Sequence, residues 1–183
     1  MKFKTRSSRW LKHLLPASIE VSSRERWRVA VAAGLSLAVV ALYWRVLGWA
    51  IDWQGQQLGL LAPLGASALL VFAMPASPMA QPWPAVIGNT LCVSAGLLAA
   101  HGLPIPELAV GVAVPASILL MYASRSLHPP GVAMALLMVL SGPESDPAAM
   151  LACGFLGSLL LVLLGCVLNP ATGKQYPVRL PAR

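Results

Sequence analysis

Charged residues are scarce in this sequence. Asp, Glu, Lys and Arg together make up 10% of its 183 residues, and only six residues are acidic. A soluble domain carries about 25% charged residues, so the composition argues against a soluble enzyme or binding module. Hydrophobic residues instead reach 57%. This balance is typical of a polytopic membrane protein built from α-helices.

Cysteines and catalytic motifs are scarce as well. The three cysteines, Cys92, Cys153 and Cys166, lie inside apolar stretches, where they predict neither a disulfide framework nor a zinc site. The sequence has no Gly-rich phosphate loop, no Gly-x-Ser-x-Gly motif and no His/Cys cluster with metal-ligand spacing. We therefore expect no enzymatic activity, no catalytic residue, no metal and no cofactor.

Six predominantly apolar stretches are present instead. They cover residues 29–51, 58–74, 84–100, 108–122, 129–140 and 148–168. A helix rises about 1.5 Å per residue and needs about 20 residues to cross a hydrocarbon core of about 30 Å. Only the first and last stretches clearly reach this length. We expect an all-α fold with four spans and two short half-helices, at 58–74 and 129–140.

Positive charge is concentrated at the two ends of the chain. Of thirteen Lys and Arg residues, eight precede the first apolar stretch and three follow the last. The positive-inside rule then predicts cytoplasmic termini for a multi-pass protein of a bacterial-type inner membrane. Residues 1–27 form a basic tail, either an interfacial helix on the lipid bilayer or disordered. A transmembrane domain, 28–170, and a second tail, 171–183, follow. No soluble domain accompanies the charge, so nucleic-acid binding is not expected.

The transmembrane domain contains a repeated pattern. A Pro-x-Gly motif at 63–65 and another at 129–131, 66 positions apart, each open a run of nine apolar or small residues. Each run ends in a turn that contains proline and serine, and the next segments begin at Pro84 and Pro147, 63 positions apart. Two copies of a three-segment unit explain this recurrence, and chance similarity is the alternative. The two copies cover residues 28–101 and 106–168.

The number of crossings stays open at the level of sequence. Six crossings invert the second copy relative to the first and put Arg125 on the cytoplasmic side. If the two short segments are re-entrant, four crossings remain and Arg125 faces outward. Both arrangements leave the termini on one side, so charge counting does not separate them.

Two helix N-termini form the predicted ion site. Proline is favoured in the first turn of a helix, so Pro63 and the pair Pro129-Pro130 mark helix starts, where Gly65 and Gly131 leave room for close approach. A helix N-terminus offers unpaired N–H groups and the equivalent of about half a positive charge. Two such ends at membrane depth are expected to bind an anion.

Arg125 and His128 precede the second of these helix starts. An ionisable residue inside the membrane marks a functional site by default. Arg125 offers a fork of donors to an oxyanion, and His128 either donates a hydrogen bond or carries a proton. Ser124 and Ser126 add hydroxyls, as ligand donors or as N-caps of the following helix. As alternatives, Arg125 snorkels to the headgroups, and His128 bonds a nearby carbonyl. Asn89 either lines the pathway or bonds across helices.

The motif His128-Pro129-Pro130-Gly131, with Arg125 upstream, resembles the HPP family of small integral membrane proteins, named for this tripeptide. The segment 62–68, which includes Ser67, the connection 75–82 and Gly88-Asn89 are similar as well, so the resemblance covers about residues 25–170. It implies about four transmembrane helices. Its plant and cyanobacterial members imply a link to nitrite transport.

We therefore expect a transporter or channel for a small monovalent anion, similar to nitrite, bound at the half-helix N-termini. His128 is the candidate proton carrier. The alternative is a structural or assembly membrane protein without a transported substrate, whose small residues pack helices together. Two three-helix layers are thin for a pore, which is compatible with a homo-oligomer.

Overall fold

The computed structural model describes residues 20–50 and 56–179, and every regular element in these residues is helical. The elements, with two 3-10 turns (η1, η2) and one π-helical turn (η3), are α2 (Ser23–Ala50), η1 (Gln56–Leu60), α3 (Leu61–Ala73), η2 (Pro78–Ala80), η3 (Pro84–Gly88), α4 (Asn89–Gly102), α5 (Pro106–Ala123), α6 (Pro130–Ser141) and α7 (Pro147–Ala171). The interfacial helix considered for the basic N-terminal tail falls on residues before Glu20, outside the described part.

Four stretches of helix are long and apolar enough to cross a membrane. They are Ser23–Gly48, Pro84–Gly102, Pro106–Ala123 and Pro147–Ala171. The helices Leu58–Ala73 and Pro130–Ser141 are apolar but shorter. With 12 residues, α6 spans about 18 Å, well below the hydrocarbon core of about 30 Å. The prediction of an all-α fold with four long and two short segments is confirmed.

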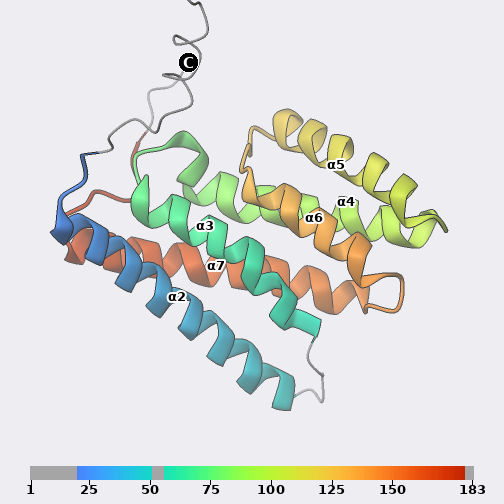
Figure 1. Cartoon of the computed structure of the whole chain (residues 1–183), viewed down its shortest axis with the longest axis horizontal. Coiled ribbons are helices and arrows are strands. Elements are labelled where there is room, and N and C mark those ends of the chain that lie inside the picture. Colours follow the sequence, from blue (N-terminus) through green and yellow to red (C-terminus); the bar gives the residue numbers. More distant parts are fainter. Residues whose placement is uncertain (1–19, 51–55, 180–183) are drawn as a thin grey trace, which may run out of the picture.

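Successive helices run in alternate directions, so their connections gather at the two ends of the molecule (Figure 1). The connection after α3 lies beside the connection after α5, because Trp83 Nε1 donates to Ser124 O at 3.1 Å. The connection after α3 also contacts the C-terminal segment, through a 2.8 Å hydrogen bond from Tyr176 Oη to Ala80 O. Arg125 therefore lies at the end of the molecule where the chain leaves α7.

Arg28 ties the first turns of α2 to the C-terminal ends of α3 and α7. Its guanidinium donates to Phe72 O at 2.6 Å and to Asn169 Oδ1 at 3.0 Å, and it pairs with Glu25 at 2.8 Å. A cation near the C-terminal end of a helix is stabilised by the helix dipole, by about 0.3–1 kcal/mol. This single arginine thus holds the ends of three helices together.

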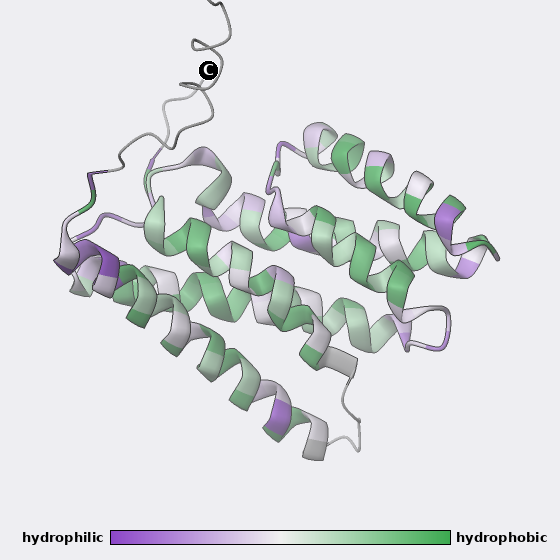
Figure 2. Ribbon diagram, viewed as in Figure 1, coloured by the Kyte–Doolittle hydropathy of each residue, from purple (hydrophilic) through white to green (hydrophobic). Residues whose placement is uncertain are grey.

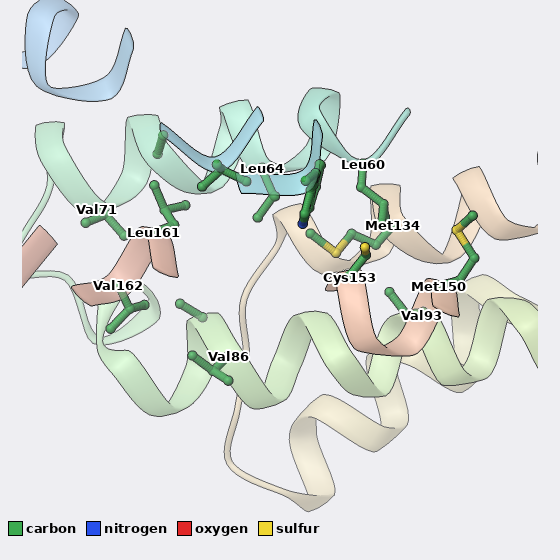
Figure 3. Packing of buried hydrophobic residues seen from close by; sticks show 14 of the residues in the cluster. Leu60, Leu64, Val71, Val86, Val93, Met134, Met150, Cys153, Leu161 and Val162 are labelled. Atoms are coloured by element: carbon green, nitrogen blue, oxygen red, sulfur yellow. The ribbon is translucent and has the colours of Figure 1, made fainter. Parts of the chain in front are cut away.

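The helices form two groups of three, α2, α3 and α7 in one and α4, α5 and α6 in the other (Figure 1). The groups meet where α4 packs against α7 and α3 against α6. The larger hydrophobic core fills this junction, with Leu64, Val93, Met134 and Leu161 among its buried residues (Figure 3). The outer helices α2 and α5 are rich in hydrophobic residues (Figure 2), and many of their apolar side chains are exposed. Such apolar outer faces suit contact with lipid.

Backbones of α4 and α6 approach each other closely. A Cβ atom added at Gly96 would lie 2.8 Å from Ala135 Cα and closer still to Ala135 O. At the other end of the contact, a Cβ atom at Gly88 would lie 3.0 Å from His128 Cβ and closer to Ser126 O. Helix association in lipid relies on small residues that permit such contacts. The second short helix is therefore held against α4 along most of its length.

Replacing Gly96 by alanine should separate α4 from α6, since the new methyl group meets backbone atoms that cannot rotate away. We expect a loss of about 1–3 kcal/mol, the usual cost of overpacking, measured as a lower thermal unfolding midpoint in detergent. The matched control is Gly34→Ala in α2, where nothing lies within 4 Å of the added Cβ. That change should be neutral or stabilise by about 0.5–1 kcal/mol. Equal midpoints for the two variants would contradict the close contact.

Candidate functional site

His128 is a fully buried ionisable side chain at the junction of the two helix groups, in the connection between α5 and α6. Its Nδ1 lies 2.7 Å from Met79 O. Because a carbonyl oxygen only accepts, Nδ1 carries a proton, and Nε2 of a neutral ring is then an acceptor. Nε2 lies 2.9 Å from Ser67 Oγ. The hydroxyl of Ser67 therefore donates to a neutral His128.

Further hydrogen bonds extend this contact across the junction. Asn89 Nδ2 donates to Ser67 Oγ at 3.3 Å and to Ser158 Oγ at 3.0 Å. Ser67 belongs to α3, Asn89 to α4 and Ser158 to α7, and all three are buried. Asn89 Oδ1 is also buried, and it has no hydrogen-bond partner among the described residues. We call His128, Ser67, Asn89 and Ser158 the polar cluster.

Local features of α4 and α6 bring the cluster together. The π-helical turn η3 directly precedes Asn89, and such turns often mark functional sites because they re-aim the residues that follow. Gly131 lets α6 start against α4, since a Cβ there would lie 3.3 Å from Asn89 Oδ1. Gly65 does not serve the cluster, because its open side faces Leu37 of α2. Of the two glycines of the Pro-x-Gly motifs, Gly131 makes room for a neighbouring helix, whereas a Cβ at Gly65 would make only an ordinary contact.

The start of α6 does not offer the unpaired N–H groups that the sequence predicts there. Pro129 and Pro130 have no N–H group. The next two N–H groups are paired, from Gly131 to His128 O at 2.9 Å and from Val132 to Pro129 O at 3.2 Å. The N–H groups of Gly131 and Val132 are therefore already paired within this helix turn and do not point free donors at an anion.

The two short helices do not point their N-termini at each other. The turn η1 runs directly into α3, so Pro63 is the third residue of α3, with a helical turn before it. A Cβ at Gly59 would lie 3.3 Å from the side chain of Leu137, late in α6, whereas Ser67 contacts His128 just before α6 begins. The helices are therefore antiparallel and side by side. The prediction that Pro63 marks a helix start is wrong, and the two short helices do not bring two N-terminal ends together.

Arg125 lies outside the polar cluster. Its side chain is exposed, and no hydrogen bond or ion pair of that side chain is found among the described residues. Its φ is 54°, and the backbone bonds from Ser126 to Met121 O (2.8 Å) and from Arg125 to Tyr122 O (3.2 Å) form a Schellman motif. Arg125 thus terminates α5 at a position where glycine is usual, and its charge faces the surface, as in the snorkelling alternative.

Ser124 and Ser126 belong to the same helix end. Ser124 Oγ donates to Leu120 O at 2.7 Å and lies 2.6 Å from Ser126 Oγ. The residue before α6 is Pro129, and no side chain caps this helix. Of the two roles considered for these serines, ligand donor or N-cap of α6, the N-cap is wrong, because Ser124 Oγ bonds the C-terminal end of α5 and Ser126 Oγ bonds Ser124.

Two members of the site were not candidates from the sequence. Ser158 follows Gly154 and Gly157, a spacing that indicates helix packing, and only the fold brings it to Asn89. Met79 contributes a backbone carbonyl, which no side-chain pattern reveals. Asn89 does bond across helices, as one of its two predicted roles requires. No group of three or more His, Cys, Asp or Glu residues among the described residues is placed to hold a metal.

The sequence model described as "HPP, transmembrane region" matches residues 18–177. The chain belongs to the HPP family. A transmembrane protein of Dictyostelium discoideum is 32% identical to this HPP protein over 153 residues, which cover 79% of the chain and 49% of the relative. A second one from that organism is 34% identical over 142 residues, covering 70% and 47%. The HPP chain therefore spans about half the length of the curated relatives it matches. No solved structure matches it. The family match and the four long apolar helices together identify a multi-pass membrane protein.

Removing the hydroxyl of Ser67 should destabilise the HPP protein, because His128 Nε2 and Asn89 Nδ2 both lose a partner in a buried place. We expect Ser67→Ala to cost about 1–3 kcal/mol, measured by thermal unfolding in detergent. Ser94→Ala is the matched control, since Ser94 Oγ bonds only Thr90 O of its own helix at 2.9 Å. Its effect should stay within about 0.5 kcal/mol. A control as unstable as Ser67→Ala would argue against the polar cluster.

Arg125 occupies a left-handed conformation that glycine adopts without strain. Arg125→Gly should therefore make the HPP protein more stable than Arg125→Ala by about 1 kcal/mol, although both variants remove the same charge. The comparison of their thermal midpoints separates the backbone effect from the charge effect. A lower midpoint for Arg125→Gly would contradict the helix end described above.

Proposed function

We propose that this HPP protein carries a small monovalent anion, similar to nitrite, across the membrane together with a proton, and that the polar cluster is its binding site. The observation that carries the proposal is His128, fully buried between the two helix groups with both ring nitrogens hydrogen-bonded. Buried ionisable residues in membrane proteins mark ion pathways and proton relays.

The cluster accommodates His128 in both of its proton states. A neutral ring accepts the Ser67 hydroxyl at Nε2. A protonated ring donates from Nε2 to Ser67 Oγ, and the hydroxyl hydrogen then turns to Pro63 O, 3.3 Å away. Nδ1 keeps its bond to Met79 O in either state. A proton can therefore be taken up or released with one rotation of a hydroxyl group.

An anion that moves with a proton suits the remaining groups. Ser158 accepts from Asn89 and keeps its own hydroxyl hydrogen as a donor to an anion oxygen, and the unpartnered Asn89 Oδ1 is an acceptor for an O–H group of a protonated ligand. Inward movement of a lone anion against an inside-negative potential costs about 2.3 kcal/mol per 100 mV. A proton carried in the same step offsets this cost.

An inverted repeat is part of the proposal. Helix pairs correspond under exchange of the two copies: α2 packs on α3 as α5 packs on α6, and α3 packs on α7 as α6 packs on α4. Transporters built in this way bind substrate between the copies. The polar cluster takes residues from both, Ser67 and Asn89 from the first and His128 and Ser158 from the second.

We also propose that the end of the molecule holding Arg28, Arg125 and Lys174 is cytoplasmic in a bacterial-type inner membrane. These cations lie at one end together with Arg24 and Arg26, which agrees with the positive-inside rule. A homo-oligomer remains part of the proposal, because α2 and α5 present broad apolar faces.

A structural role in assembly is the second candidate function. The complete burial of His128 and the bond from Asn89 to Ser158 are what a packing cluster requires. Polar bonds between transmembrane helices stabilise them by about 0.6–2 kcal/mol. The two candidate functions differ in one respect. A packing role does not require the unpartnered Asn89 Oδ1, whereas the transport proposal uses this oxygen as a hydrogen-bond acceptor for the ligand.

Uptake into proteoliposomes tests the transport proposal. We expect purified protein to accelerate nitrite entry over protein-free liposomes, more so with an inward proton gradient, and His128→Ala to reduce the protein-dependent rate at least tenfold. Ser94→Ala, which lies outside the cluster, should keep the wild-type rate. Nitrate, formate and chloride, supplied one at a time, define the range of anions.

Two results would reject transport in favour of assembly. One is nitrite entry no faster than in protein-free liposomes, for a protein that unfolds at its normal midpoint. The other is an unchanged uptake rate in a His128→Ala variant whose thermal midpoint falls. In the second case the side chain stabilises the bundle and takes no part in transport.

A further inference from the structure

The segment that follows α7 folds back over the connection between α3 and α4, whose Met79 carbonyl accepts a hydrogen bond from His128. The chain reverses at Gly173, whose φ of 80° lies in the left-handed region, where glycine has no steric penalty. Lys174 N donates to Asn169 O at 2.9 Å and closes this turn. The chain then passes along the connection between α3 and α4. We call residues 174–178 the strap.

Tyr176 is the main attachment of the strap. Its ring is buried, and its hydroxyl donates to Ala80 O at 2.8 Å. A Cβ at Gly165 would lie 3.0 Å from Cε1 of the ring, so the ring rests in a notch of α7. Burial raises the pKa of the Tyr176 phenol, which keeps its hydroxyl protonated as a donor.

Gln81 is the second attachment. Its Oε1 accepts from Val178 N at 2.8 Å. Its Nε2 donates to Pro75 O and to Ser77 O, both at 2.9 Å. The side chain of Gln81, which follows the short turn η2 containing Met79, therefore joins the strap to the residues just before that turn.

Met79 lies directly before the two residues that the strap holds. Its carbonyl accepts from His128 Nδ1, whereas Ala80 and Gln81 bond to Tyr176 and Val178. The connection is thus held from two sides, by His128 toward the membrane core and by the strap at the end of the molecule. Movement of the strap away from this connection removes its outer support.

We propose that the strap keeps the connection 74–83 closed over His128, and that its release opens the polar cluster to water from this end of the molecule. The strap regulates access to the site of the proposed function, and its biological meaning rests on that function. Access to His128 itself is measurable without any transported solute.

The contacts of the strap suit reversible release. Apart from the Tyr176 ring, they are single hydrogen bonds and an ion pair between Lys174 and Glu25 at 3.2 Å, with the lysine 41% exposed. Exposed ion pairs contribute little to stability. A groove of about 660 Å³ runs between the strap and the connection, lined by Met74, Pro78 and Gln175 among others. The connection is therefore not sealed on this side by apolar packing.

Chemical modification of the whole 183-residue chain in detergent tests this proposal. Diethyl pyrocarbonate modifies imidazole nitrogens that water can reach, and peptide mass spectrometry assigns each modified histidine. We expect wild-type His128 to be protected relative to the exposed His101. Tyr176→Phe, which removes only the hydroxyl, should raise the His128 rate at least fivefold, and Tyr176→Ala more. Tyr122→Phe, on the exposed face of α5, is the control and should leave it unchanged.

A second reporter separates strap release from general loosening. Cys153 is buried in the hydrophobic core between the helices, and its reaction with N-ethylmaleimide is followed in the same variants. Faster modification of His128 with Cys153 still protected supports the strap, including when only Tyr176→Ala produces it. Unchanged His128 in both variants, or a parallel increase at Cys153, overturns the proposal. Because no anion is added, the result stands apart from the nitrite experiment.

Discussion

A buried imidazole has to pair both of its ring nitrogens, and the pairing of His128 sets the positions of several other elements. Nδ1 needs the carbonyl of Met79, which fixes the connection between α3 and α4. Nε2 needs the hydroxyl of Ser67, which fixes α3 beside the start of α6. A buried polar group left unpaired costs about 1–3 kcal/mol. Through Asn89 the requirement extends to Ser158 and so to α7.

This polar pairing is possible only because two backbones come unusually close. Hydrogen bonds near 3 Å demand that α6 start directly against α4, and Gly88, Gly96 and Gly131 remove the side chains that would prevent it. In a bilayer no hydrophobic force drives helices together, so close packing and polar bonds have to do so jointly. The glycines and the polar cluster are therefore parts of one arrangement. The glycine positions set the distance, and the cluster sets the register.

The sequence predicts the scaffold better than the site, for identifiable reasons. Apolar stretches and prolines are local signals, so the six segments and the starts at Pro84, Pro130 and Pro147 could be read directly, whereas Pro63 lies inside α3. His128 could be singled out because an ionisable side chain among apolar segments is costly. The role of Arg125 could not be predicted, since its charge suggests that it binds a ligand, whereas its backbone conformation terminates α5. Two consecutive prolines also remove two N–H donors, a chemical detail that contradicts an anion site at that helix start. Ser158 required the fold itself.

The proposed repeat indicates how a movement of one copy against the other would affect the hydrogen bonds of the polar cluster. With offsets of 66 for the short helices and 63 for the segments after them, each cluster residue has an alanine as its counterpart. The pairs are Ser67 with Ala133, His128 with Ala62, Asn89 with Ala152 and Ser158 with Ala95. Under the proposed repeat the scaffold holds one cluster, and three hydrogen bonds join the copies: His128 to Ser67, His128 to Met79, and Asn89 to Ser158. If one copy rocks against the other, as inverted-repeat transporters do, these bonds have to break. The ring of His128 then loses both partners and meets water at the moment the site opens. Proton exchange would in this way be tied to the movement of the two copies.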